Sequence, residues 1–122
     1  MHSENYIHKL KSNNLSKAEE RRIGFPFSHG LLKREELICI GTTQAALLAL
    51  ENGVSFNVAG GTHHAHRDFG EGYCLYNDIA VAAQYLLNNH KVKQILVVDL
   101  DVHQGNGTAS IFKNEPRVFT FS

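Results

Sequence analysis

Two clusters of polar side chains have the residue types that a hydrolytic metal site requires. One cluster closes an apolar run with Asp99, Asp101 and His103 at alternate positions, ahead of a glycine-containing turn. The other contains the adjacent histidines His63 and His64 after two glycines. Aspartate oxygens and histidine nitrogens bind zinc, and histidine can take a proton from water and return one to a leaving group. The sequence therefore predicts a metal-assisted hydrolase.

Both clusters are expected at one edge of a sheet. Each follows an apolar run, 54–59 or 95–98, that predicts a strand. In open α/β sheets, ligands bind beyond the carboxyl ends of the strands, and side chains two positions apart on a strand share a face. Taken singly, the aspartates also suit helix capping or ion pairing, and the histidines also suit an exposed loop. Convergence of the two clusters favours a catalytic site.

Helical and strand patterns alternate after an irregular start. Residues 1–30 are expected to be irregular, with a charged, solvated helical stretch at 17–22. The expected helices are 31–52, 77–89 and 108–113, and the expected strands are 54–59, 95–98 and 118–121. This alternation is typical of an α/β fold, and the continuous apolar run at 95–98 indicates a strand covered on both faces. The predicted architecture is a three-layer parallel sheet with helices on both faces.

The predicted sheet is small, which suggests an incomplete domain. About three strands is fewer than the usual five or six, so we expect residues 1–122 to be a partial domain. An unpaired strand and exposed apolar surface would then favour self-association through the sheet edge.

Composition narrows the function classes. The 122 residues are 43% hydrophobic and 20% charged, with 12 Lys plus Arg against 12 Asp plus Glu, so no general nucleic-acid or membrane partner is expected. No signal peptide is visible, and the apolar runs are too short to span a bilayer. Cys39 and Cys74 lack metal-type spacing, which predicts a reducing, cytoplasmic location, with a nuclear one left open for a eukaryotic source. Cys74 is a candidate reactive thiol, but a small buried residue is the favoured interpretation.

Three ordered blocks resemble the histone deacetylase family, which has the arginase–deacetylase fold. They are residues 60–65, 70–78 and 98–108, and the resemblance covers about 22–122, after an irregular segment at 1–21. The third block is similar to that of the class IV branch and related bacterial proteins. The resemblance implies a zinc-dependent deacetylase that hydrolyses the amide of an acyl-lysine protein or an acylated small amine. The arginase or ureohydrolase branch is a weaker alternative, because it uses two manganese ions and more aspartates.

The resemblance assigns the catalytic machinery residue by residue. Asp101 and His103 match two of the family's three zinc ligands. His63 and His64 match its tandem histidines, which transfer protons to and from the attacking water and the leaving amine. Which of these two histidines acts as the base is left open by the sequence.

The resemblance also assigns supporting positions. Asp99 matches the carboxylate that orients the first histidine and contacts a structural monovalent cation, for which potassium is the candidate. Ser122 matches another ligand of that cation. Gly72 and Tyr73 match positions that line the tunnel for the acyl-lysine side chain.

This chain departs from the family pattern in two ways. Many members have an aspartate where Asn106 stands, so His64 should feel less pull toward its protonated form. The family's third zinc ligand and its carbonyl-binding tyrosine lie downstream of the third block and have no counterpart here. We therefore expect residues 1–122 by themselves to have much less deacetylase activity than a full-length relative. The alternative function is a non-catalytic deacetylase-like fragment or interaction partner.

Overall fold

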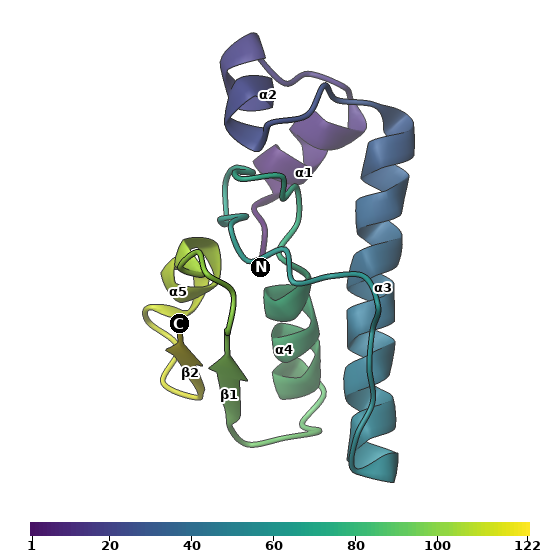
Figure 1. The fold of residues 1–122 in the computed structure, drawn as a ribbon, viewed down its shortest axis with the longest axis vertical. Coiled ribbons are helices and arrows are strands. Elements are labelled where there is room, and N and C mark those ends of the chain that lie inside the picture. Colours follow the sequence, from purple (N-terminus) through teal and green to yellow (C-terminus); the bar gives the residue numbers. More distant parts are fainter.

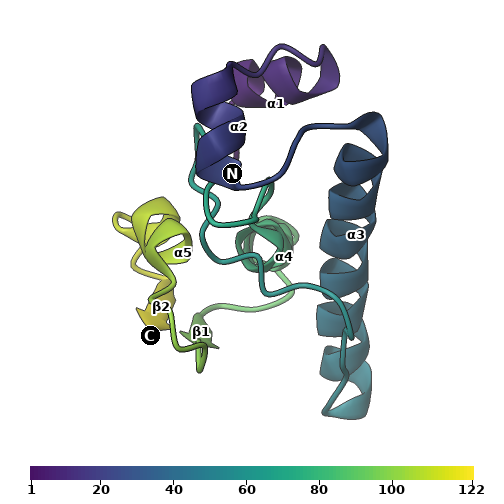
Figure 2. The same ribbon diagram turned by 45° about the horizontal axis from the view of Figure 1, so that its top comes forward.

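A long helix and a small parallel sheet frame the structure, a computed structural model that describes all of residues 1–122. The helices are α1 (Glu4–Lys11), α2 (Lys17–Ile23), α3 (His29–Asn52), α4 (Asp78–Asn88) and α5 (Asn106–Phe112), and the strands are β1 (Ile95–Val98) and β2 (Val118–Phe121). Figure 1 shows α4 between α3 and the sheet. Figures 1 and 2 show α1 and α2 at the end of the molecule where α3 begins.

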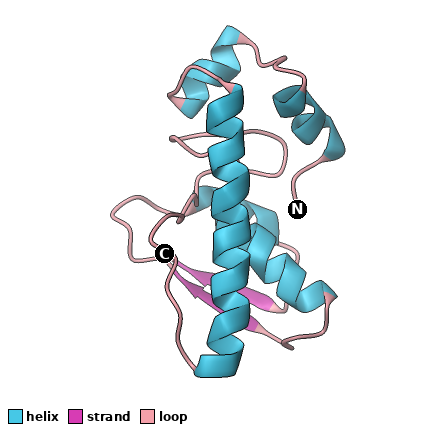
Figure 3. Ribbon diagram, turned by 90° about the vertical axis from the view of Figure 1, so that its right-hand side faces the viewer, coloured by secondary structure: helices cyan, strands magenta, loops and turns pink.

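The sheet is parallel, as predicted, and α5 provides its crossover. β1 and β2 pair in register from Ile95 opposite Val118 to Val98 opposite Phe121, and Figure 3 shows the two strands side by side. One face of the sheet contributes to a buried cluster with α4 and α5, formed by Ala80, Ala83, Leu87, Val97, Phe112 and Val118. The α/β class and the parallel sheet are therefore confirmed, in a sheet small enough for an incomplete domain.

The opposite face of the sheet is bare. Leu96 and Val98 of β1 are 63% and 53% exposed, and Phe119 and Phe121 of β2 are 66% and 60% exposed. The continuous apolar pattern at 95–98 predicted cover on both faces, whereas these residues place helices on one face only. Burial of an apolar side chain requires a second layer, and no helix of this chain packs there.

The prediction of a third strand at residues 54–59 is wrong. The segment is irregular and makes no ladder with β1 or β2. Its apolar residues Val54, Phe56 and Val58 are exposed. Alternating hydrophobicity stabilises a strand only when one face is buried and a neighbour accepts its hydrogen bonds, and this segment has neither.

The prediction that residues 1–30 are irregular is also wrong, because α1, α2 and the start of α3 lie there. Ser3 caps α1 by accepting from the backbone N–H of Tyr6, and Ser16 and Glu19 form a capping box at the start of α2. Gly24 ends α2 in the left-handed region, at φ 91°. The charged stretch 17–22 is helical, as expected. The missed signal was Ser-x-x-Glu at 16–19, a capping-box spacing.

The other predicted helices are confirmed within a few residues. Ser28 caps α3, which ends before Gly53, and Asn77 caps α4. α3 and α4 are joined by a hydrogen bond of 2.6 Å from the Thr42 hydroxyl to the Asp78 carboxylate. None of the helices combines the length and apolarity that crossing a bilayer demands.

A second core lies under α1 and α2. Its buried residues are Tyr6, Leu10, Ile23, Leu32, Cys39, Leu75 and Tyr76. The Tyr6 hydroxyl donates to the Leu75 carbonyl oxygen over 2.9 Å, which ties α1 to the segment before α4. Both cysteines are free and buried. Burial raises the pKa of the Cys74 thiol to about 11, which disfavours the thiolate and supports the structural interpretation of this residue.

Protonation of His2 is expected to destabilise the fold. The backbone N–H of Asn77 donates to Nε2 of His2 over 3.0 Å. Burial lowers the pKa of His2 from 6.5 to about 4. The unfolded chain therefore binds this proton at a higher pH than the folded chain. Stability should be full above about pH 6.5 and should fall between 6.5 and 4, by on the order of 3 kcal/mol.

Urea unfolding at several pH values measures how the free energy of unfolding changes with pH. The matched variant His2→Gln keeps an acceptor for Asn77 but has no proton to gain, so its stability should vary less over the same interval. Identical slopes in the two proteins would show that His2 does not control this pH dependence.

Candidate active site

Asp99, Asp101 and His103, the acidic cluster, lie in the segment that follows β1. Asp99 extends the ladder, because its N–H donates to the Phe121 carbonyl oxygen over 2.8 Å. The chain then bends: the N–H of Asp101 donates to Oδ1 of Asp99 over 3.0 Å, and the N–H of His103 donates to Oδ1 of Asp101 over 2.8 Å. The strand itself ends at Val98. These two hydrogen bonds bend the chain and bring the side chains of Asp99, Asp101 and His103 together, whereas the prediction relied on continued strand alternation.

His63 is buried against the acidic cluster. Its Nδ1 lies 2.5 Å from Oδ2 of Asp99, and its Nε2 lies 4.0 Å from Oδ1 of Asp101. The side chains of His63 and Asp99 are only 8% and 11% exposed. The Asp99 carboxylate only accepts hydrogen bonds, so the facing Nδ1 of His63 is the ring nitrogen that carries the hydrogen. The loop histidine and the strand-end carboxylate, predicted from separate parts of the chain, therefore form one unit.

His64 lies beside His63 but has a different partner. The two imidazole centroids are 4.1 Å apart, and the His64 centroid is 5.9 Å from that of His103. Nδ1 of His64 lies 2.7 Å from the amide oxygen of Asn106. One histidine therefore faces a carboxylate and its neighbour faces a neutral amide.

Asp101 and His103 can supply two ligands to one metal ion. Oδ1 of Asp101 and Nδ1 of His103 are 3.1 Å apart, close to the roughly 3.3 Å that separates two ligands of a tetrahedral zinc. Hydrogen bonds from the backbone and ring of His103 lower the pKa of the Asp101 carboxyl, so it is ionised at neutral pH, as a ligand must be. Their side chains are 52% and 72% exposed. No group of three or more His, Cys, Asp and Glu side chains is arranged to hold a metal.

Gly72 and Ser122 contact the site, and Tyr73 lies next to it. Gly72 has φ 53°, and a Cβ there would lie 2.6 Å from Cδ2 of His64, so only glycine lets the backbone approach the ring. Tyr73 is 63% exposed, and its predicted role in lining a substrate tunnel stays a prediction. The Ser122 hydroxyl accepts from the N–H of Gly105 over 2.9 Å, near Asp99. Its predicted role as a cation ligand stays a prediction.

Sequence reasoning missed the residues that hold the histidine loop. Asn77 donates from its side-chain amide to the carbonyl oxygens of His63 and Ala65, over 3.4 and 3.1 Å, and to the Thr108 hydroxyl over 2.9 Å. Asp78 accepts from the backbone and hydroxyl of Thr62, over 2.8 and 2.7 Å. Their position as helix-capping residues gave no signal of this long-range contact.

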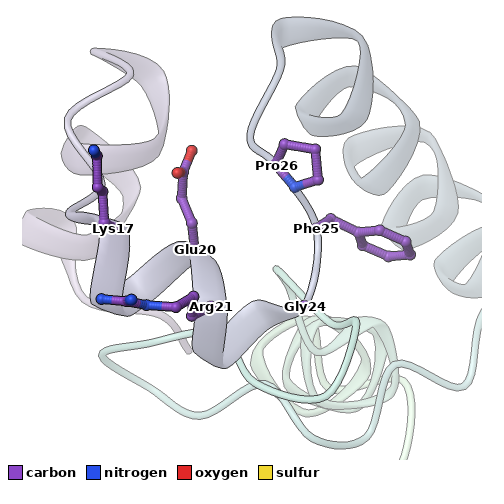
Figure 4. A pocket seen from close by; sticks show the side chains of 6 residues that line it. All are labelled: Lys17, Glu20, Arg21, Gly24, Phe25 and Pro26. Carbon is purple, nitrogen blue, oxygen red and sulfur yellow. The ribbon is translucent and has the colours of Figure 1, made fainter.

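The hollow shown in Figure 4 lies outside this site. It has a volume of about 460 Å³ and is lined by Lys17, Glu20, Arg21, Gly24, Phe25 and Pro26. Three of these come from α2, and Phe25 and Pro26 come from the segment that follows it. The Phe25 ring meets the Tyr73 ring at 4.9 Å between centroids, so the hollow borders the segment that includes Tyr73. Its lining contains none of the candidate catalytic residues.

Comparison with known proteins agrees with the geometry. The sequence matches the histone deacetylase domain over residues 1–122. It is 45% identical to an uncharacterised protein of Picosynechococcus, with 100% of this chain and 41% of the relative covered. It is 32% identical to histone deacetylase 2 of Arabidopsis thaliana, with 98% of this chain and 32% of the relative covered.

A solved structure supports the same assignment. The crystal structure of an HDAC homolog complexed with SAHA superimposes with a TM-score of 0.80 at 32% sequence identity, covering 98% of this chain and 34% of that chain. The chain therefore spans between about a third and two-fifths of the length of these relatives. By sequence and by fold, this chain belongs to the histone deacetylase family, a family of hydrolases.

Proposed function

We propose that this chain carries the histidine-bearing part of a zinc-dependent site that hydrolyses acyl-lysine amides. The observation that supports this most directly is the juxtaposition of the His63–His64 pair with the Asp101–His103 pair. Amide hydrolysis needs a nucleophilic water, a polarised carbonyl and a proton for the leaving nitrogen. A bound zinc ion, held by Asp101 and His103 together with a third ligand from outside these two clusters, would supply the first two.

The two histidines are suited to different steps. His63 has the Asp99 carboxylate at Nδ1, and its Nε2, 4.0 Å from Asp101, is placed to pass a proton to the leaving amine or to stabilise a developing oxyanion. His64 has the neutral Asn106 amide on Nδ1, so its Nε2 can take a proton from the attacking water. We therefore assign the base to His64 and electrostatic support to His63.

The substrate proposal rests on the family. The amide of an acyl-lysine protein, or of an acylated small amine, matches the chemistry described above. The family's third zinc ligand and carbonyl-binding tyrosine have no counterpart among these 122 residues. Loss of one oxyanion donor typically costs about 10²–10³ in rate, so turnover by residues 1–122 alone should be at least that much slower than in a relative with the tyrosine.

Zinc binding tests the proposal directly. Purified protein, stripped of metal and titrated with zinc, should bind one ion, and Asp101→Ala should weaken this binding by at least about tenfold because one of two ligands is lost. His90→Ala is the matched control, since His90 is an exposed histidine just after α4 and makes none of the site contacts described above. An acetyl-lysine peptide added to the zinc-loaded protein should release acetate slowly, and only with Asp101 present. Equal zinc binding by the wild type and Asp101→Ala would overturn the ligand assignment.

The bare side of the sheet favours a second candidate function, association with another chain. Beyond Leu96 and Val98, the residues Leu100 and Val102 are 86% and 92% exposed. Exposed apolar surface at an unpaired edge strand invites pairing. A protein that binds no zinc and releases no acetate, but forms dimers or larger species in light scattering, would support this candidate instead.

A further inference from the structure

The amide of Asn106 must be oriented before His64 can have a defined proton position. An asparagine amide presents an acceptor oxygen on one side and a donor NH2 group on the other. With the oxygen toward the ring, Nδ1 of His64 must carry the hydrogen; with the NH2 group toward the ring, Nδ1 must be the lone pair. The two orientations have nearly the same shape, so a neighbouring group has to select between them.

Glu71 is that neighbour. Nδ2 of Asn106 lies 3.0 Å from Oε2 of Glu71. An ionised carboxylate only accepts hydrogen bonds, so the side of the amide that faces Glu71 must be the NH2 group. The oxygen then faces His64, and it also accepts from the backbone N–H of Gly107 over 3.0 Å. Both contacts select the same orientation.

Glu71 is itself held in place. Its backbone makes a two-way bridge with Cys74, with N···O distances of 3.1 and 2.9 Å. Nε2 of His66 lies 3.5 Å from the same carboxylate oxygen that Asn106 contacts, and the His66 ring stacks on Phe69 with centroids 4.4 Å apart. The turn that carries Glu71 also places Gly72 against the His64 ring. The Glu71 side chain, 38% exposed, is therefore positioned by the bridge of its own backbone and by the neighbouring His66 ring.

We propose that Glu71 is a positioning residue that acts through Asn106 to hold His64 in the tautomer with hydrogen on Nδ1. In this tautomer Nε2 keeps its lone pair, which is the state that a base requires. Asn106 has no carboxylate of its own, but the Glu71 carboxylate lies one hydrogen bond beyond its amide, on the side away from His64. The inference deepens the proposed function of His64, but its main readout needs neither zinc nor turnover.

The tautomer can be measured by NMR on the full chain with isotope-labelled histidine ring nitrogens, at about pH 8, where histidines are neutral. The His64 signals are assigned by their loss in His64→Ala. Wild type should show His64 in the Nδ1–H form. Glu71→Ala should convert it to a mixture with the Nε2–H form. His63, which has Asp99 as its partner, serves as the internal control and should keep its tautomer in both proteins.

Exchange of the two partners tests the pairing itself. Asn106→Asp alone places two carboxylates face to face, and their repulsion should displace one of the two side chains and disturb the His64 signals. Asn106→Asp combined with Glu71→Gln restores one donor and one acceptor, so His64 should recover the Nδ1–H form. A circular dichroism spectrum that matches the wild-type spectrum shows, for each variant, that the fold is retained. If Glu71→Ala does not fold, the comparison of Asn106→Asp with the double variant Asn106→Asp, Glu71→Gln still tests the proposal.

The outcomes separate the two proposals. If His64 keeps a single Nδ1–H tautomer in Glu71→Ala, or if Asn106→Asp behaves identically with and without Glu71→Gln, the positioning role is wrong. Failure to bind zinc or to cleave an acetyl-lysine peptide would overturn the proposed function and leave the tautomer result standing. In a zinc-loaded, active protein, the exchanged pair should recover kcat lost in Asn106→Asp with little change in KM.

Discussion

Replacement of Asp78 by alanine should lower the free energy of unfolding by about 3 kcal/mol or more. The Asp78 residue is 1% exposed, and its carboxylate accepts from the backbone N–H of Gly61, from the backbone and hydroxyl of Thr62, and from the hydroxyl of Thr42. Alanine leaves these donors without their acceptor. It also removes a negative charge from the first turn of α4, where the helix dipole favours one.

The structural consequence should extend to the histidines. Asp78 holds the loop that leads directly into His63, and Thr42 links the same carboxylate to α3. Without it, α3, α4 and the loop lose their common attachment point, so the His63–Asp99 contact should loosen as well. This couples the stability of the domain to the geometry of the site.

Urea unfolding followed by circular dichroism gives the size of the effect. Asp68→Ala is the matched control, because Asp68 is an exposed aspartate in the same region and its loss should change stability by less than about 0.5 kcal/mol. A midpoint for Asp78→Ala close to that of the control would mean that the loop donors find other partners at little cost.

Gly107→Ala should destabilise the protein by about 2–4 kcal/mol. Gly107 lies in the first turn of α5, where helix propensity alone predicts a gain of about 1 kcal/mol for alanine. Packing predicts the opposite. A Cβ there would overlap the carbonyl oxygen of Ala65 and lie 2.6 Å from that of His63. Backbone atoms cannot move aside as a flexible side chain can, so packing should decide the sign.

The clash should separate α5 from the histidine loop. The N–H of Thr108 donates to the His63 carbonyl oxygen over 3.1 Å, and this bond requires the close approach that Gly107 permits. Gly30→Ala is the matched control, since Gly30 is exposed in the first turn of α3 and its nearest contact would be 3.8 Å away. It should stabilise the protein by a few tenths to about 1 kcal/mol. Thermal unfolding of both variants compares the signs, and stabilisation by Gly107→Ala would contradict the structure.

Local sequence signals determined most of the secondary structure. The apolar run at 95–98 and the helical pattern at 31–52 correspond to β1 and α3. Hydrophobic periodicity and helix caps are formed by neighbouring residues, so the sequence shows them directly. The signals failed at the N-terminus, where the caps Ser3 and Ser16 were missed. They failed again at 54–59, because strand formation depends on a partner that a local pattern cannot reveal.

The candidate catalytic residues were also visible in the sequence. His63, His64, Asp99, Asp101 and His103 belong to motifs whose residue types alone indicate metal-assisted proton transfer. Ordered blocks of this kind identify the family because each motif is a short, contiguous segment. Their approach in space, with His63 on Asp99 at 2.5 Å, was predicted from two strand ends, but in the structure only Asp99 follows a strand.

Only the tertiary structure decided what supports those residues. The sequence indicates Asp78 and Asn77 as helix caps, yet they hold a loop 12 to 17 residues earlier in the chain. The sequence shows Asn106 as a neutral substitute for an aspartate, yet Glu71, 35 residues away, lies behind it. Hydrogen bonds between distant segments depend on how helices and loops pack, and residue spacing carries no record of that packing. The sequence determined which groups can do the chemistry, and the tertiary structure decided which neighbours orient them.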